Sequence, residues 1–319
     1  MIRSFFIYLS KAGWARKFIT GWGFAWNLAS RFVAGEKLTD AIQVIRMLNA
    51  KGINATLDHL GEHTDSLAAS QAAAKDIIEA LDAIQKSGIR SNVSIKLTQI
   101  GLKIDHKACA ENLRAILAHA RELGNFIRID MEEAAVTQVT LDLLMQMRQE
   151  GFENVGIVIQ SYLYRSESDV QNLDSKGITV RLCKGAYKEP AEVAYPKKQD
   201  VDASFDRIAA LLMKGSIALG APAISADGRI PPIPCIATHD LQRIQNAKET
   251  AAKLGLPKDA LEFQMLYGIR RDLQEQLAAD GYYVRVYVPY GTEWYPYNMR
   301  RLAERPANVW FIFSNFFRR

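Results

Sequence analysis

The sequence predicts an α/β protein in which eight strands and their helices form a closed (βα)8 barrel of the TIM type. Eight short apolar or β-branched runs recur along the chain, at residues 53–60, 92–97, 126–131, 155–160, 178–183, 233–240, 261–266 and 282–288. At least seven helix-like stretches separate them, and such alternation is typical of a parallel sheet covered by helices. Eight strand–helix units in about 260 residues match the size of a closed barrel. An open doubly wound sheet is the alternative, but it would usually contain fewer strands.

The chain before the first strand is predicted to be helical. Residues 1–50 form this N-terminal segment, and its last helix is expected over 39–52. That stretch opens on Thr39 and Asp40, which can cap a helix, and closes at Lys51-Gly52.

The barrel itself is predicted to occupy residues 51–308. Its most regular helical stretches are 67–88 and 107–124. The longest interval between strands contains a helix and a loop rich in proline and glycine, residues 219–234. Residues 309–319 follow as an aromatic tail that ends in two arginines.

The composition describes an ordinary globular protein. The chain has 319 residues, of which 49% are hydrophobic and 24% charged, so it can bury a sizeable core. Its three cysteines, Cys109, Cys183 and Cys235, are too scattered for a disulfide framework or a thiolate metal site. The net charge of +5 comes without a dense block of Lys and Arg, so no nucleic-acid partner is expected. We expect neither a signal peptide nor a membrane-spanning helix.

Polar residues gather where the predicted strands end. Functional side chains of such barrels collect at the C-terminal ends of the strands. The polar residues found there are Asp58, His59, Lys96, Asp130, Gln160, Arg181, Lys184, Thr238, His239, Gln264 and Tyr287. Together with Arg300 and Arg301 they predict a basic pocket, tempered by Asp130 and Glu62. Such a pocket suits a small anion beside a larger polyanionic or electron-rich ligand.

The segment "YNMRRLAERPAN", residues 297–308, places two arginines side by side. On a helix, Tyr297, Arg300 and Arg301 would share one face. Two guanidinium groups on one face repel each other unless an anion lies between them. The alternative is a solvated pair, or one bridged to Glu304.

Several motifs are absent from the sequence. "GWGFAW" (21–26) lacks the third glycine of a dinucleotide fingerprint, and there is no P-loop. His59 and His63 fall in a predicted loop, where helical spacing does not apply, so we predict no metal site. Two other functions stay open on the residues alone. Lys96 or Lys184 could form a Schiff base, as in an aldolase, or the barrel could bind a ligand without catalysis.

Five separated segments resemble the proline dehydrogenase family. They are "TLDHLGE" (56–62), "VSIKLTQIG" (93–101), "IRIDMEE" (127–133), "RLCKGAYKE" (181–189) and "YNMRRLAERPAN" (297–308), in the family's order. The length resembles the monofunctional bacterial form. The resemblance implies a distorted barrel after N-terminal helices, with non-covalently bound FAD across the C-terminal ends of the strands. Two departures are Cys183, which we interpret as core, and the loop 219–234, which is long for the family and leaves open how the adenine end is covered.

The resemblance also implies roles for individual residues. Lys96, Arg300 and Arg301 would hold the substrate carboxylate, Tyr287 and Tyr297 would line the proline ring, and Leu182 would pack beneath it. Asp130 would orient the basic cluster, and Arg181 would approach flavin N5. The FAD contacts would further include Met131, Gln160, Lys184, Gly185, Ala186, Thr238 and His239. Glu62 would be a gate residue that pairs with Arg300.

The implied reaction is the oxidation of L-proline to 1-pyrroline-5-carboxylate by hydride transfer to flavin N5, the first step of proline catabolism to glutamate. Electrons would pass to quinone or another membrane acceptor, and the product to a separate pyrroline-5-carboxylate dehydrogenase. The enzyme would be cytoplasmic. Both termini are apolar and basic enough for peripheral contact with the inner face of the cytoplasmic membrane; the alternative is that they pack on the barrel or form a self-association surface.

Overall fold

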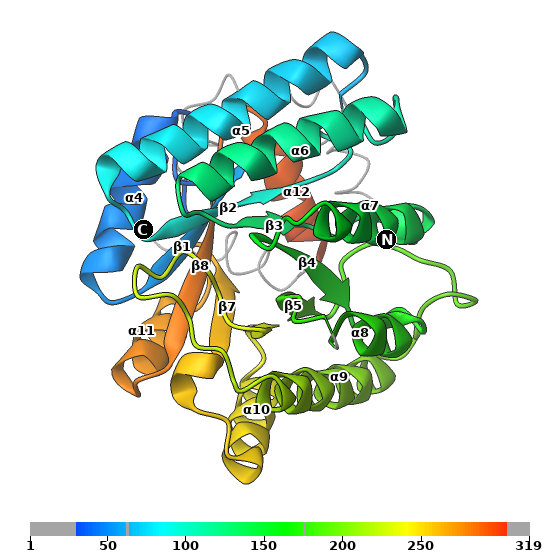
Figure 1. Cartoon of the computed structure of the whole chain (residues 1–319). Coiled ribbons are helices and arrows are strands. Elements are labelled where there is room, and N and C mark those ends of the chain that lie inside the picture. Colours follow the sequence, from blue (N-terminus) through cyan, green and yellow to red (C-terminus); the bar gives the residue numbers. More distant parts are fainter. Residues whose placement is uncertain (1–29, 62–63, 175, 305–319) are drawn as a thin grey trace, which may run out of the picture.

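Eight parallel strands form a closed barrel in this protein, as the sequence predicts (Figure 1). The computed structural model describes residues 30–61, 64–174 and 176–304. The strands are β1 (Asn54–His59), β2 (Ser91–Ile95), β3 (Ile127–Ile129), β4 (Val155–Gln160), β5 (Val180–Cys183), β6 (Pro234–Ala237), β7 (Glu262–Leu266) and β8 (Tyr283–Tyr290). Each strand pairs with the next, and β8 returns to pair with β1. Every predicted run overlaps its strand.

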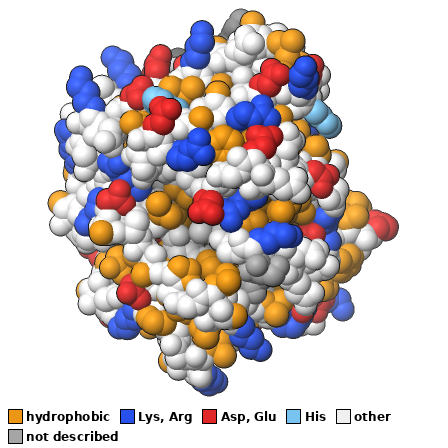
Figure 2. All heavy atoms as spheres, viewed as in Figure 1, with side chains coloured by type: hydrophobic (Ala, Val, Ile, Leu, Met, Phe, Trp, Pro, Cys, Tyr) orange, Lys and Arg blue, Asp and Glu red, His pale blue; other side chains and the backbone are white. Residues whose placement is uncertain are grey.

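Helices lie between successive strands and surround the barrel (Figure 1). They are α4 (Leu38–Ala50), α5 (Leu67–Ser87), α6 (His106–Glu122), α7 (Thr137–Gln149), α8 (Ser166–Asp174), α9 (Lys198–Ala218), α10 (Leu241–Leu254), α11 (Arg271–Ala279) and α12 (Trp294–Glu304). Two 3-10 turns, Ala134–Val136 and Lys258–Ala260, precede α7 and β7. On the face seen in Figure 2, basic and acidic side chains are interspersed.

The start of α4 differs from the predicted cap. The helix begins at Leu38, so Thr39 and Asp40 lie within its first turn. The Asp40 carboxylate instead accepts a hydrogen bond from the Lys37 backbone N–H at 3.2 Å. A carboxylate at this third position satisfies a backbone donor at the helix start, which is the other half of a capping box.

The barrel is distorted at its last helix. In a regular barrel the helix after the eighth strand would cover the outer wall, but here α4 packs against β1 and β8. Helix α12 packs instead with Val33 and with Leu60, which lies just beyond the C-terminal end of β1. The chain after β8 is therefore brought to the end of the barrel where the strands finish.

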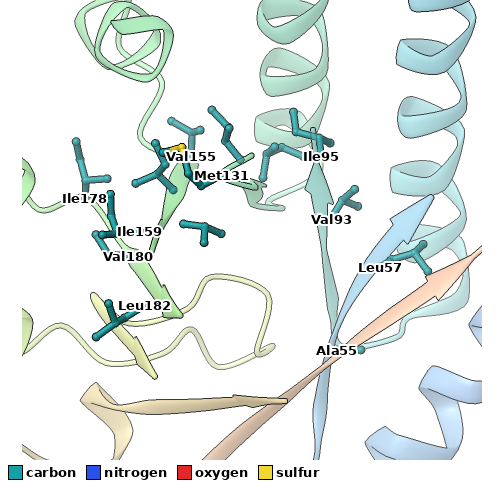
Figure 3. Close-up of a cluster of buried hydrophobic side chains, with 14 of the residues drawn as sticks. Ala55, Leu57, Val93, Ile95, Met131, Val155, Ile159, Ile178, Val180 and Leu182 are labelled. Carbon is teal, nitrogen blue, oxygen red and sulfur yellow. The ribbon is translucent and has the colours of Figure 1, made fainter. Parts of the chain in front are cut away.

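The apolar core lies between the strands and the surrounding helices. Successive side chains of a strand point to opposite faces, and the outward ones are apolar, as for Ala55 and Leu57 on β1 or Val93 and Ile95 on β2 (Figure 3). The inward ones are largely polar, including Thr56, Asp58, Ser94, Arg128, Glu262 and Arg285, all of them buried. The interior of this barrel is thus a polar network inside an apolar layer.

The loop 219–234 closes the N-terminal end of the barrel. Arg285 Nη2 donates to the Gly228 carbonyl at 2.7 Å, and Asn92 Nδ2 donates to the Arg229 carbonyl at 3.0 Å. Gly228 has φ +69°, and a Cβ there would lie 2.5 Å from Asn54 Oδ1 at the start of β1. The long loop is therefore at the opposite end from the predicted pocket and contacts the bottom of the barrel.

Candidate active site

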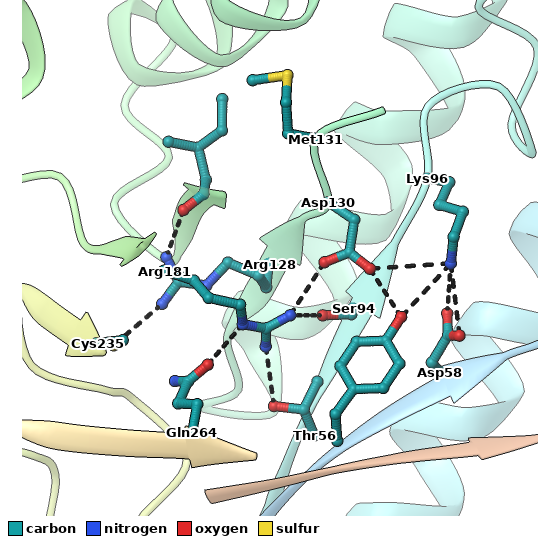
Figure 4. A network of polar contacts seen from close by, with 12 residues as sticks. Thr56, Asp58, Ser94, Lys96, Arg128, Asp130, Met131, Arg181, Cys235 and Gln264 are labelled. Carbon is teal, nitrogen blue, oxygen red and sulfur yellow. Dashed lines mark hydrogen bonds and ion pairs between the residues drawn. The ribbon is translucent and has the colours of Figure 1, made fainter. Parts of the chain in front are cut away.

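Arg181 is the centre of a buried polar cluster inside the C-terminal half of the barrel (Figure 4). Its Nη1 donates to Asp130 Oδ1 and to Ser94 Oγ, each at 3.0 Å. Its Nε donates to Gln264 Oε1 at 2.5 Å, and its Nη2 donates to Thr56 Oγ1 at 3.3 Å. Side chains from three strands, β1, β2 and β7, and from the segment after β3 therefore fix one guanidinium group, and the Arg181 side chain is 8% exposed.

Lys96 occupies the other side of Asp130. Its Nζ lies 3.1 Å from Asp58 Oδ1, 3.4 Å from Tyr287 OH and 3.8 Å from Asp130 Oδ2. Tyr287 OH in turn donates to Asp130 Oδ2 at 2.7 Å. Two carboxylates, one ammonium and one guanidinium thus share a continuous set of contacts.

Burial shapes the titration of this cluster. It raises the pKa of Asp58, and the Lys96 ammonium opposes the rise. Burial, together with the charges of Asp130 and Asp58, holds the pKa of Tyr287 well above its ordinary value. Tyr287 is therefore a neutral phenol that can donate to Asp130.

A second set of buried polar side chains supports Arg181 from the side nearer the N-terminal ends of the strands. Gln264, which accepts from Arg181, donates through Nε2 to Glu262 Oε1 at 2.5 Å. Glu262 pairs with Arg285 through two hydrogen bonds of 2.8 and 2.9 Å, and both side chains are fully buried. A buried charge needs such pairing. The sequence pattern identified Gln264 but not Glu262 and Arg285, although both stand at inward positions of their strands.

Gln160 and Met131 lie at the ends of neighbouring strands. Gln160 is 3% exposed, and its Nε2 donates to the Met131 carbonyl at 3.2 Å. Its buried Oε1 has no hydrogen-bond partner among the described residues. A buried amide oxygen without a partner is costly, so this position fits a ligand that brings a donor, such as a flavin ring.

Lys184 lies beyond the end of β5 in an ion-pair cluster. Its Nζ is 2.5 Å from Asp202 Oδ1 on α9 and 2.7 Å from Asp240 Oδ2. Lys198 also pairs with Asp202. Although partial burial acts in the opposite direction, the Lys184 ammonium lowers the pKa of Asp240 to about 2. Lys184, which was predicted to contact the FAD phosphates, is therefore paired with two carboxylates in this structure.

The neighbouring residues 185–186 and 238–239 also lie at the ends of strands. Gly185 has φ +108°, and a Cβ there would lie 2.2 Å from the ring of Tyr162. Thr238 Oγ1 accepts from the Asp240 N–H at 3.1 Å. His239 Nε2 accepts from the Leu266 N–H at 3.0 Å, which assigns the ring proton of a neutral His239 to Nδ1. Because Gly185 has no side chain, its backbone can lie directly against the ring of Tyr162.

Helix α12 confirms that the arginine pair is helical. The backbone of Arg300 and Arg301 lies within α12, together with Tyr297; that the three residues share one face stays a prediction from helical spacing. Tyr297 is buried in the cluster formed with Val33 and Leu60. The side chains of the two arginines, and the predicted gate Glu62, lie outside the described part of the chain.

Leu182 requires a correction. Its neighbour Arg181 points into the barrel, so Leu182 points outward. It is fully buried beside Val180 in the apolar layer (Figure 3). The structure therefore excludes Leu182 from the floor of the substrate pocket.

Two searches of the described residues add to this description. No group of three His, Cys, Asp or Glu side chains is arranged to hold a metal ion within 30–61, 64–174 and 176–304. Within the same ranges no helix is long and apolar enough to cross a membrane. His63, one half of the rejected histidine pair, lies outside the described residues.

Comparisons with known proteins agree on one family. The family described as "Proline dehydrogenase" matches residues 41–313. The chain is 45% identical over 291 residues to proline dehydrogenase of Deinococcus radiodurans, covering 90% of this chain and 89% of the relative. It is 39% identical to proline dehydrogenase 2 of Bacillus subtilis, covering 98% of this chain and 97% of the relative.

A solved structure has the same architecture. Proline utilization A (PutA) from Bdellovibrio bacteriovorus, inactivated by N-propargylglycine, superposes with a TM-score of 0.79 at 28% identity. The similarity covers 87% of this chain but only 32% of that longer one.

Proposed function

This chain belongs to the proline dehydrogenase family, as its five motifs predict, and we propose that it oxidises L-proline to 1-pyrroline-5-carboxylate with non-covalently bound FAD. Its family membership makes it an enzyme of proline catabolism. The observation that carries the finer proposal is the buried guanidinium of Arg181, held by Asp130 at the strand ends beside a second cation, Lys96.

The substrate carboxylate would bind between Lys96 and the two arginines of α12. Helix α12 lies at the end of the barrel where Lys96 is found, which supports a shared site. Arginine suits a flat carboxylate because its planar fork makes two parallel hydrogen bonds. Tyr287, in contact with Lys96, and Tyr297 on α12 would line the ring.

The substrate amine must be neutral before it can release a hydride from the adjacent ring carbon. The nearby cations Lys96 and Arg181 disfavour a third positive charge in the pocket. Asp130 holds Arg181 in place, and Arg181 would stabilise negative charge that develops beside it. When bound, FAD would accept the hydride at N5, which is the chemistry the protein cannot supply itself.

Several described residues fit an FAD molecule across the strand ends. The unpartnered Oε1 of Gln160 and the side-chain-free approach at Gly185 support this placement. Met131, Lys184, Ala186, Thr238 and His239 would complete the cofactor site. Lys184 would contact a phosphate group of FAD while it also remains paired with Asp202 and Asp240.

The Schiff-base alternative is disfavoured by the charges. A lysine must be neutral to attack a carbonyl, whereas Lys96 contacts Asp58, and Lys184 contacts Asp202 and Asp240. Both lysines are therefore engaged in ion pairs with carboxylates rather than presented as nucleophiles.

The remaining parts of the proposal concern the surroundings of the reaction. Electrons would pass to quinone, and the product to a separate pyrroline-5-carboxylate dehydrogenase. We place the enzyme in the cytoplasm, with peripheral contact to the inner membrane face through its termini. The proposed division is an N-terminal segment 1–50, a catalytic barrel 51–308 and a tail 309–319, with Glu62 as gate.

Ligand discrimination tests this function. L-proline should reduce an acceptor dye in the presence of the enzyme, and prolinamide, which lacks the anion, should be a very poor substrate. Tetrahydro-2-furoate has the carboxylate but no oxidisable amine, so it should compete with proline without bleaching the flavin. A protein without flavin whose substrate is trapped by borohydride would instead support the Schiff-base alternative, and equal turnover of prolinamide would reject the carboxylate site.

A further inference from the structure

Asp58 is a buried carboxylate to which neither the motifs nor the comparisons give a role. It stands at an inward position of β1 and is 1% exposed. Both of its oxygens accept from Lys96 Nζ, at 3.1 and 3.4 Å. Among the described residues, the ion pair of Asp58 is with Lys96.

Lys96 stands between two carboxylates, and the geometry distinguishes them. Asp130 Oδ2 is 3.8 Å from Lys96 Nζ, farther than either oxygen of Asp58. Asp130 already accepts from Arg181 at 3.0 Å and from Tyr287 at 2.7 Å. Each carboxylate therefore has a principal cation: Asp58 has Lys96, and Asp130 has Arg181.

We propose that Asp58 is a positioning residue, which holds the Lys96 ammonium toward the substrate carboxylate and leaves Asp130 to Arg181 and Tyr287. This inference rests on the proposed function. Buried charges are stable only when paired and hydrogen-bonded, and Asp58 supplies the nearer of the two carboxylates to Lys96.

Removing the charge of Asp58 should redirect Lys96. In Asp58→Asn the nearest described carboxylate to Lys96 is Asp130, so the ammonium should turn toward it and away from the ligand. A ligand carboxylate would then lose a charge-assisted hydrogen bond, and binding should weaken by about tenfold or more. The asparagine has nearly the same shape, so the change tests charge rather than packing.

A double-mutant cycle on the FAD-loaded enzyme tests the inference. Tetrahydro-2-furoate binding, followed by the change in the flavin spectrum, is compared in wild type, Asp58→Asn, Lys96→Met and the double variant. We expect each single variant to bind about tenfold more weakly or worse, and the double variant to bind no worse than Lys96→Met. Asp280→Asn, which removes an exposed carboxylate that pairs with Lys248, is the matched control and should bind as wild type does.

Two binding results would overturn the inference. One is wild-type affinity in Asp58→Asn; the other is an undiminished effect of Asp58→Asn in the Lys96→Met background, since Asp58 would then act without Lys96. If wild type itself fails to bind tetrahydro-2-furoate, the proposed function is wrong. If wild type binds it and only the variants behave differently from expectation, this inference alone is wrong.

Thermal stability provides the second readout. With Lys96 removed, Asp58 becomes a buried carboxylate without its cation, so Asp58→Asn should change the Tm more favourably in the Lys96→Met background than in wild type. This holds even where a single variant fails to fold, because the double variant should then recover a folded state. Equal Tm shifts in the two backgrounds, or a double variant that also fails to fold, would contradict the pairing on which the proposal depends.

Discussion

At the scale of single residues, the phenol of Tyr287 joins the two halves of the site. Its hydroxyl donates to Asp130 at 2.7 Å and lies 3.4 Å from Lys96 Nζ. The ring also lies against Arg181, whose Cζ is 5.3 Å from the ring centroid. One side chain thus contacts the ammonium of Lys96, the carboxylate of Asp130 and the guanidinium of Arg181.

Replacing Tyr287 by phenylalanine should lower kcat/KM by about tenfold to a hundredfold. A hydrogen bond to a charged group contributes about 1.5–3 kcal/mol, and the variant leaves one Asp130 oxygen without its closest donor. Steady-state kinetics with L-proline measure the effect. Tyr283→Phe, at the exposed start of the same strand, is the control and should be unchanged; equal kinetics in the two variants would remove the hydroxyl from the mechanism.

The arginine pair of α12 is tested by substitution to methionine, which keeps much of the length but removes the donors. Arg300→Met and Arg301→Met should each lower kcat/KM for proline by about tenfold to a few hundredfold. Lysine should restore part of the loss, because it supplies a charge without a planar fork. Undiminished competition by tetrahydro-2-furoate in both methionine variants would show that these residues do not hold the carboxylate.

The sequence predicted the members of the polar cluster better than their contacts. Polar residues at strand ends identified Lys96, Asp130 and Arg181, because the ends of successive parallel strands meet at one end of a barrel. Strand alternation could also have excluded Leu182, since Arg181 must point inward. It could not show that Asp58, rather than Asp130, would be the nearer partner of Lys96, because that depends on side-chain conformations across three strands.

At the scale of elements, the segment that follows β5 is fixed by close packing. Gly185 combines φ +108° with a ring 2.2 Å from any added Cβ. The Tyr162 N–H also donates to the Lys184 carbonyl at 3.0 Å. The position of this segment relative to the strand ends therefore depends on a residue without a side chain.

Gly185→Ala should lower both the stability of the protein and its flavin content. The left-handed backbone alone costs about 1–2 kcal/mol for a residue with a Cβ, and displacement of Tyr162 adds to it. Gly255→Ala is the control, because Gly255 has φ +72° but nothing within 4 Å of an added Cβ. The flavin-to-protein ratio should fall in Gly185→Ala only; a normal ratio there would contradict a cofactor role for this segment.

The ion-pair cluster around Lys184 predicts a pH dependence of stability. The pKa of Asp240 is depressed to about 2 in the folded protein, so its contribution is present above the unfolded value and is lost as pH falls through the folded one. Asn at this position still caps α10 but carries no charge. The Tm difference between wild type and Asp240→Asn should be full above about pH 5 and shrink toward about pH 2. A constant difference across this range would contradict the pairing.

The elements themselves were predictable, but the position of one helix, α12, was not. Apolar runs located all eight strands, because outward faces must be apolar to pack on helices. The place of α12 beyond the strand ends depends on contacts with Val33 and Leu60, which are distant in sequence. No local pattern distinguishes such a helix from one on the outer wall.

At the scale of the whole molecule, the loop 219–234 closes one end of the barrel and the candidate active site lies at the other. The loop 219–234 contacts Asn54, Asn92 and Arg285 at the bottom, and the cluster around Arg181 lies above them. The sequence gives the length of this loop but not its position, because its contacts are to residues more than a hundred positions away or on another side of the barrel. The polar interior connects the two ends through Glu262 and Gln264.

The central claim is that this buried cluster, with Arg181 at its centre, supports reduction of a bound flavin by proline. The rate of anaerobic flavin bleaching by L-proline, measured in wild type and in Arg181→Met with equal FAD content, tests it most directly. We predict that L-proline bleaches the wild-type flavin, and that Arg181→Met lowers the bleaching rate more than it weakens proline binding, because the interaction strengthens as charge develops. A wild-type flavin that stays yellow with proline, or an unchanged rate in Arg181→Met, would contradict the account.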